Sequence, residues 1–167
     1  MKPFRDTLGA FATGVTVVTA RAPDGELVGI TANSFNAVSL DPQLVLVSFA
    51  RSLRSLPALL KAPAFAINLL CHDHRHLSQQ FARPGDAKWD GVETEDGLAG
   101  SPLLCDRLAH FECSPWATYD GGDHVIVVGK VEDYGLVRDD EPLVFFRGAY
   151  RSLSRPQPAP DLVCAAR

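Results

Sequence analysis

A row of small polar side chains between residues 29 and 42 could bind a planar polar ligand. Thr31, Asn33 and Ser34 follow the end of an expected strand, and a second polar group ends in Asp41-Pro42. An Asp-Pro step favours a turn before the next strand. The alternative is that these hydroxyl and amide groups only cap a loop, and composition alone favours that alternative.

Two further segments carry groups suited to a charged ligand or to proton chemistry. Residues 48–55 combine three serines with Arg51 and Arg54 at the start of an expected helix, where guanidinium and free N–H groups could hold a phosphate. The run Gly-Gly-Asp-His places His124 beside Asp123 at the edge of an expected strand. Histidine is easily tuned near neutral pH, so this pair is a candidate for reaction chemistry, although the glycines are equally consistent with a simple turn.

Other familiar sites find little support in the sequence. It contains neither Gly-x-Gly-x-x-Gly nor Gly-x-x-x-x-Gly-Lys-Ser/Thr, which argues against Rossmann and P-loop nucleotide sites. His72, His74 and His76 alternate and would share one face of a strand as metal ligands. They lie at an expected strand-to-helix junction, where a solvated cap is the commoner explanation, so we expect no metal site. Cys71 beside them is expected to be a small buried hydrophobe.

Short strands must position these groups. Apolar and β-branched runs separated by Pro and Gly predict strands at residues 14–19, 27–31, 44–49, 64–69, 110–113, 125–131 and 143–146. A turn signal at residues 22–25 joins the first two as a hairpin, and apolar residues on both faces of several strands indicate a closed or doubly covered barrel. One-sided apolar patterns predict helices at residues 4–11, 52–60 and 73–81, the last with Asp73 as N-cap.

Composition fits a single domain that buries a core. The 167 residues are 46% hydrophobic and 22% charged, which is the range of ordinary globular proteins. A net charge of −4 with scattered Lys and Arg leaves no basic stripe for nucleic acid. Apolar runs are too short to span a bilayer, and the first residues lack the apolar region of a secretory signal. We therefore expect a cytoplasmic protein with free cysteines and no membrane or nucleic-acid partner.

The sequence has no internal repeat and no change of composition that would mark a second domain. We expect one domain at residues 1–154. Prolines at alternate positions from Pro156 to Pro160 remove backbone donors and cannot pair in a sheet. Residues 155–167 are therefore expected to form an extended C-terminal tail.

Seven short segments, taken in order and with their spacing, resemble a known family. They are Phe11–Val15, Thr31–Phe35, Ser39–Pro42, Phe81-Ala82, Lys88-Trp89, Gly122–His124 and Phe146–Tyr150. Together they resemble the flavin reductase-like family of FMN-binding split barrels, the reductase components of two-component flavin monooxygenases. The resemblance covers residues 4–152. It implies a mainly β fold, a six-stranded antiparallel split β-barrel with flanking short helices, and a homodimer with flavin bound at the subunit interface.

Site residues are implied by this resemblance. For flavin binding it implies ten residues from four segments: Thr31, Ala32, Asn33, Ser34, Ser48, Arg54, Ser55, Phe81, Arg83 and Tyr150. The first four would meet the isoalloxazine ring and ribityl chain, the next three the ribityl chain and phosphate, and the next two would close over the flavin, with Tyr150 near the ring. His124, with Asp123, matches the position associated with the nicotinamide donor. Arg51 stays open as an alternative to Arg54 for the phosphate.

The implied activity is hydride transfer from NADH or NADPH to FMN or FAD, which would supply reduced flavin to a partner monooxygenase. The hydride chemistry belongs to the cofactors, so the protein would supply stacking and orientation, with His124 orienting the nicotinamide. One alternative is a flavin-binding electron-transfer or storage module without nicotinamide turnover, against which His124 argues. Another is an enzyme like pyridoxine-phosphate oxidase, which would need a second basic cluster that we do not find. The sequence does not choose between the flavins or between the nicotinamides.

Overall fold

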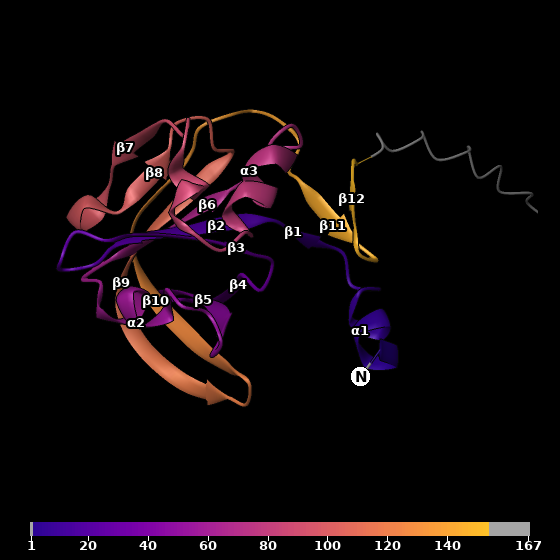
Figure 1. Ribbon diagram of the computed structural model, residues 1–167, viewed down its shortest axis with the longest axis horizontal. Coiled ribbons are helices and arrows are strands. Elements are labelled where there is room, and N and C mark those ends of the chain that lie inside the picture. The colour runs from indigo at the N-terminus through magenta and orange to yellow at the C-terminus, as the bar shows by residue number, and fades with distance from the viewer. Residues whose placement is uncertain (1, 154–167) are drawn as a thin grey trace, which may run out of the picture.

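The computed structural model describes residues 2–153, and strands are its main element. The helices and strands, labelled as in Figure 1, are α1 Lys2–Leu8, β1 Thr13–Gly14, β2 Thr16–Arg21, β3 Leu27–Ala32, β4 Asn36–Leu40, β5 Gln43–Ala50, α2 Leu56–Lys61, β6 Phe65–Leu69, α3 Arg75–Phe81, η1 Asp86–Trp89, β7 Thr94–Asp96, η2 Leu98–Gly100, β8 Pro102–Leu104, β9 Ala109–Gly121, β10 His124–Leu136, β11 Val144–Phe146 and β12 Ala149–Arg151. The elements η1 and η2 are short 3-10 helices. The expected mainly β class is confirmed.

Seven strands form the principal sheet in the order β3-β2-β6-β9-β10-β5-β4, and every neighbouring pair is antiparallel. The sheet is strongly curved, and β9 and β10 project from it as a long hairpin (Figure 1). The expected six-stranded barrel differs from this pairing, because the sheet has seven strands and, within residues 2–153, no ladder joins its edges β3 and β4. The expected first hairpin is confirmed, since β2 pairs with β3 from Thr16↔Ala32 to Arg21↔Leu27.

Both faces of the sheet are buried, as the apolar strands predict. On β2, Val18 belongs to a core that includes Phe65, whereas Val17 belongs to a second core that includes Phe81 of α3. Neighbouring residues of a strand face opposite sides, so one strand serves both cores. The second core holds α3 against the sheet, and the C-terminal end of α3 then lies beside β3.

Helix α2 begins four residues later than the sequence predicts. It runs from Leu56, with Ser55 as N-cap and a proline in its first turn, so residues 52–54 form a turn instead of a helix. Proline is well tolerated in the first turn of a helix because it has no N–H to leave unpaired there. The phosphate-binding segment expected at a helix start is therefore a turn that precedes a six-residue helix.

The predicted N-cap of α3 is wrong by one residue. His74 occupies that position, without a side-chain capping hydrogen bond. The carboxylate of Asp73 instead accepts hydrogen bonds from the guanidinium of Arg138, at distances of 3.3 to 3.4 Å. A guanidinium from a distant loop thus takes the carboxylate that local sequence assigns to capping. Helix α1 ends at Leu8, three residues before the predicted end.

The hairpin of β9 and β10 is the largest departure from the predicted strand lengths. Each strand has 13 residues, whereas the sequence predicts strands over 110–113 and 125–131. Pro115 looks like a strand end in the sequence, but it pairs with Gly129 of β10 beside a shift in register. A bulge of this kind tolerates a proline within a strand and bends the pair.

The remaining predictions concern the chain end, the cysteines and the membrane. Residues 155–167 and the boundary at 154 lie outside the described residues, as does Cys164. Cys71, Cys105 and Cys113 are free thiols, and Cys71 is fully buried as expected. Within the described part of the chain, every helix is too short or too polar to cross a bilayer.

Candidate functional site

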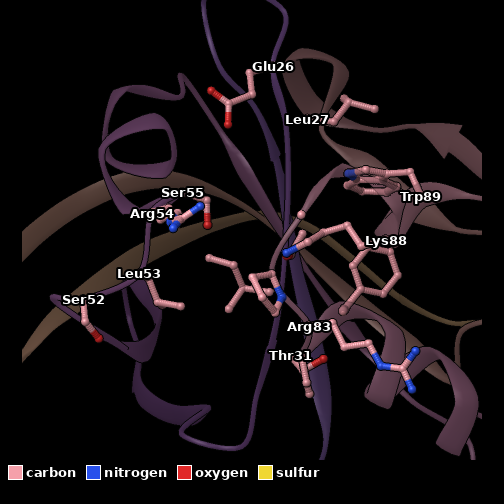
Figure 2. Close-up of a pocket in the computed structure, with 16 residues that line it drawn as sticks. Glu26, Leu27, Thr31, Ser52, Leu53, Arg54, Ser55, Arg83, Lys88 and Trp89 are labelled. Carbon is pink, nitrogen blue, oxygen red and sulfur yellow. The ribbon is translucent and has the colours of Figure 1, made fainter.

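A cleft of about 810 Å³ lies between β3, the turn before α2, and the segment from the end of α3 to η1. Its sixteen lining residues are Glu26, Leu27, Gly29, Ile30, Thr31, Ser52, Leu53, Arg54, Ser55, Phe81, Ala82, Arg83, Pro84, Gly85, Lys88 and Trp89. Five of the predicted flavin-binding residues are among them. Figure 2 shows Arg54 and Ser55 on one wall, with Arg83, Lys88 and Trp89 facing them across the cleft.

The cleft carries more positive than negative side chains. Arg54, Arg83 and Lys88 line it. Among the described residues that line the cleft, Glu26 is the one with an acidic side chain. The Nζ atom of Lys88 donates a hydrogen bond to the carbonyl of Gly29 at 2.9 Å, which holds this ammonium group over β3. Three cations in one cleft favour a ligand that bears negative charge, such as a phosphate.

An aromatic pair forms one wall. The rings of Phe81 and Trp89 meet edge to face, with centroids 4.9 Å apart. Gly29 makes room for both, because a Cβ atom there would lie 2.5 Å from the Phe81 ring and 3.0 Å from Cζ2 of Trp89. The nitrogen of the same indole, Nε1 of Trp89, is buried and has no hydrogen-bond partner among the described residues. This wall thus presents the partly exposed indole of Trp89, packed on the buried ring of Phe81.

The predicted ring-binding segment divides between two pockets. Thr31 lines the large cleft, where its hydroxyl donates a hydrogen bond to the carbonyl of Ser78 at 2.7 Å. Asn33 lines a second pocket of about 220 Å³, bordered by residues 11–16. Because β3 ends at Ala32, the alternation of a strand no longer places Asn33 on the same side as Thr31. Ala32 itself packs against the core that includes Val18 and Phe65.

Ser34 and Ser48 contact each other instead of lining either pocket. The Ser34 hydroxyl donates to the carbonyl of Ser48 and accepts from its N–H, both at 3.0 Å. One side chain therefore completes both main-chain groups of a residue on β5. Phe81, predicted to close over the flavin, is 2% exposed and belongs to the second core, whereas Arg83 is exposed beside it.

Tyr150 of β12 is anchored to α3. Its hydroxyl lies 2.8 Å from the Ser78 hydroxyl, and the guanidinium of Arg75 lies 5.3 Å from the centre of its ring. The Ser78 carbonyl also accepts the hydrogen bond from Thr31, so Tyr150 connects to the cleft through α3. Tyr150 lines neither of the two pockets.

His124 and Asp123 lie at the tip of the long hairpin, where β10 begins. The Nδ1 atom of His124 is 2.7 Å from a carboxylate oxygen of Asp123, and the side chain of His124 is 43% exposed. The hydrogen bond from His124 lowers the pKa of Asp123. In the ladder between β5 and β10, His124 pairs with Ala50. The chain passes from Ala50 directly into the turn that lines the cleft, so the hairpin tip and the cleft share one segment.

The three alternating histidines do not share one face. His74 is 3% exposed, with Nδ1 accepting a hydrogen bond from the N–H of Cys71, and His76 is exposed on α3. His72 pairs with Asp140, at 3.2 Å. The prediction of a solvated cap is wrong for His74, because the loop that carries Arg138 covers it.

Lys88 and Trp89 are two of the cleft residues to which the sequence assigns no role. The sequence matches them to the family only as a dipeptide, and the structure places that dipeptide in η1. A signal was present: a Lys-Trp pair just after Pro84-Gly85 joins a cation and a large ring to a turn that can bend toward a strand.

Comparison with known proteins shows which family this chain resembles in sequence. A family model described as "Flavin reductase like domain" matches residues 8–154. The chain is 47% identical to FMN reductase (NADH) SmoA of Agrobacterium fabrum, over 92% of this chain and 87% of that protein. It is 40% identical to the reductase component of a flavin-dependent trigonelline monooxygenase from Acinetobacter baylyi, over 90% of this chain but 48% of that relative, so it spans about half of it.

Solved structures give the same result. The NADH:FAD oxidoreductase SgcE6 of Streptomyces globisporus C-1027 superposes with a TM-score of 0.86 at 34% sequence identity, covering 94% of this chain and 90% of that one. Both the sequence and the fold match over nearly the whole length. The chain therefore belongs to the flavin reductase-like domain family.

Proposed function

We propose that this protein is a flavin reductase that oxidises NADH or NADPH and reduces FMN or FAD, with the flavin bound in the large cleft. The observation that carries the proposal is the combination in one cleft of three cations and the partly exposed indole ring of Trp89. A flavin has the complementary features, since it joins a planar ring bearing carbonyl and ring-nitrogen acceptors to a phosphate. The names of the relatives support the same activity.

Arg54 and Ser55 would hold the phosphate on one wall, with Arg83 and Lys88 opposite them. Arg54 is favoured over Arg51 for this role, because the side chain of Arg51 is already bound to the hairpin turn. The Thr31 hydroxyl and the Phe81–Trp89 wall would orient the ring. When bound, the flavin supplies a ring position that accepts hydride from the nicotinamide.

His124 would position the nicotinamide at the hairpin tip. Its Nδ1 atom is bound to Asp123, which restrains the ring and leaves Nε2 to act as donor or acceptor. A half-exposed imidazole held in this way can orient a carboxamide without acting as an acid.

Three finer statements complete the proposal. The curved sheet would serve as the split barrel of the family, two copies would form a dimer, and the reduced flavin would pass to a monooxygenase in the cytoplasm. One relative is named as the reductase component of a monooxygenase, which supports a monooxygenase as the partner that receives the reduced flavin. Two copies would also give the ligand a second wall beside the open cleft.

The test is a direct assay. Purified protein is mixed with FMN or FAD and with NADH or NADPH, and absorbance at the nicotinamide band is followed. Flavin-dependent loss of that absorbance, above the rate without protein, is expected for at least one pair. Flavin binding with no nicotinamide oxidation in any pair would favour the storage or electron-transfer module instead.

A further inference from the structure

Arg51 lies between the cleft and the hairpin tip and binds the tip through three contacts. Its main-chain N–H donates to the carbonyl of Asp123 at 2.9 Å. Its Nε atom donates to the carbonyl of Gly122 at 2.9 Å, and an Nη atom lies 2.7 Å from the carboxylate of Asp120. Two of the three acceptors, Gly122 and Asp123, form the turn that precedes His124, and Asp120 lies near the end of β9.

The turn itself depends on these contacts. Gly122 has φ of 73°, a conformation that glycine adopts readily and other residues rarely. Its N–H donates to the carboxylate of Asp120 at 3.1 Å, so this carboxylate bonds both to the turn and to Arg51. The hydrogen bond from Arg51 is the largest cause that lowers the pKa of Asp120.

We propose that Arg51 is a positioning residue for nicotinamide turnover, which fixes the hairpin turn and so sets the place of the His124 imidazole relative to the cleft. The inference rests on the proposed function, because it takes His124 as the residue that orients the nicotinamide. The guanidinium of Arg51 is bound to Gly122 and Asp120, so we assign the flavin phosphate to Arg54.

A planar guanidinium suits this task better than an ammonium group would. Arg51 uses two different nitrogens, directed at a carbonyl and at a carboxylate, whereas lysine has one point donor. Arg51→Lys keeps the charge but cannot make both contacts, so it is expected to behave like Arg51→Ala. Asp120→Ala removes the opposite charge and the same anchor.

The experiment compares Arg51→Ala, Arg51→Lys and Asp120→Ala with wild type, measuring KM for NADH, kcat, and flavin affinity by titration. Positioning predicts that all three raise KM for NADH or lower kcat, by about tenfold in kcat/KM, because small displacements of an orienting group are costly. Flavin affinity is expected to change less than twofold. Arg54→Ala is the matched variant from the same turn and is expected to weaken flavin binding instead.

Two results would overturn the positioning role of Arg51. If Arg51 attracted an anionic ligand by its charge, Arg51→Lys would keep near-normal kinetics and Asp120→Ala would lower KM for NADH, which would overturn the proposal. Weaker flavin binding in Arg51→Ala, equal to that in Arg54→Ala, would also overturn it. Lys130→Ala removes an exposed cation that pairs with Glu132 elsewhere on the hairpin, and it controls for loss of charge alone.

Amide hydrogen exchange at residues 120–124 separates this proposal from the proposed function. Faster exchange there in Arg51→Ala is expected whether or not the protein turns over NADH. If wild-type protein oxidises no nicotinamide, the proposed function fails while the exchange still tests the contacts. If exchange rises but nicotinamide kinetics in an active enzyme stay normal, the positioning role is overturned.

Discussion

The indole of Trp89 places an unpaired donor in the wall of the cleft. A buried N–H without an acceptor costs about 1 to 3 kcal/mol, and a ligand acceptor would recover that free energy. Trp89→Phe removes the donor and keeps an edge-to-face contact with Phe81. We expect the ligand-free variant to melt at the same or a higher temperature, while flavin affinity falls roughly fivefold, about 1 kcal/mol.

Thermal melts and flavin titrations of Trp89→Phe would check this, with Trp116→Phe as control because that ring is 53% exposed on β9. Unchanged flavin affinity would show that no ligand acceptor meets the indole nitrogen. A lower melting temperature without flavin would report the packing lost when the smaller ring replaces the indole, and the flavin titration would then be the test of the donor.

Ser34 and Asn33 are neighbours in sequence, but we expect only Ser34 to contribute clearly to the free energy of unfolding. Ser34→Ala deletes two hydrogen bonds to the main chain of Ser48 and is expected to lower the free energy of unfolding by about 1 to 2 kcal/mol. Asn33 is exposed and makes a single 3.3 Å contact with Thr13, so Asn33→Ala should leave stability within about 0.5 kcal/mol. Urea unfolding measures both effects. Equal destabilisation by the two changes would contradict this distinction.

His124 can be tested by separating kinetics from stability. If it orients the nicotinamide, His124→Ala should cost about 1 to 3 kcal/mol of transition-state stabilisation, as a higher KM for NADH or a lower kcat. Flavin binding and the melting temperature should stay nearly unchanged, because the side chain is half-exposed and bonds only to the exposed Asp123 within the described residues. Normal kinetics with a clearly lower melting temperature would remove His124 from the site.

At the scale of elements, strand β9 buries His110 in a place that disfavours the protonated imidazole. Burial, and secondly the nearby Arg107, lower the pKa of His110, while Glu112, Asp133 and Glu95 act in the opposite direction. In the unfolded chain the imidazole binds a proton near pH 6.5, but in the fold only at lower pH. The contribution of the neutral imidazole to the free energy of unfolding is therefore complete above about pH 6.5 and is lost as the pH falls from there toward the lower pKa of the folded state.

Urea unfolding of His110→Gln at a series of pH values tests this effect. Between pH 7.5 and about 5.5, its free energy of unfolding should decline less than that of wild type, because one proton-binding group of the unfolded chain is gone. His76→Gln, exposed on α3, is the control. Parallel pH curves for wild type and His110→Gln would contradict the prediction.

Local sequence predicted the elements whose causes are local. The β-branched run at residues 14–19 and the turn signal at 22–25 specify the first hairpin without help from distant residues. Strand β4 was missed because it is an exposed edge strand with polar residues, which resembles a loop. The length of β9 was missed because Pro115 ends a regular strand but is accepted at a bulge.

The site could be predicted only in part because it is assembled from distant segments. Thr31, Arg54 and Arg83 were predicted and do line one cleft. Ser34 and Ser48 were predicted as ligand contacts, yet they bond to each other, and only pairing between strands could show that. The side-chain contacts of Arg51 likewise depend on residues about 70 positions away in sequence.

For the whole molecule, the exposed apolar stripe at the N-terminus bears on the dimer. Phe4, Leu8 and Phe11 are 69%, 57% and 76% exposed, and α1 lies apart from the sheet beside β11 and β12 (Figure 1). Main-chain contact between Gly9 and Arg147 attaches this segment to the β11–β12 turn, but its apolar face has nothing to cover it among the described residues. Burying one such side chain contributes about 1.5 to 3 kcal/mol, which a second copy could supply.

We therefore expect sedimentation to show a homodimer and Leu8→Asp to shift it toward monomer, because a buried unpaired carboxylate is costly. Leu136→Asp is the matched control, since Leu136 is 86% exposed at the end of β10, far from α1 in sequence. If Leu136→Asp dissociated the dimer and Leu8→Asp did not, the interface would lie along the hairpin instead. A wild-type monomer at saturating flavin would contradict the dimer altogether, and the cleft of one subunit would then have to bind both flavin and nicotinamide.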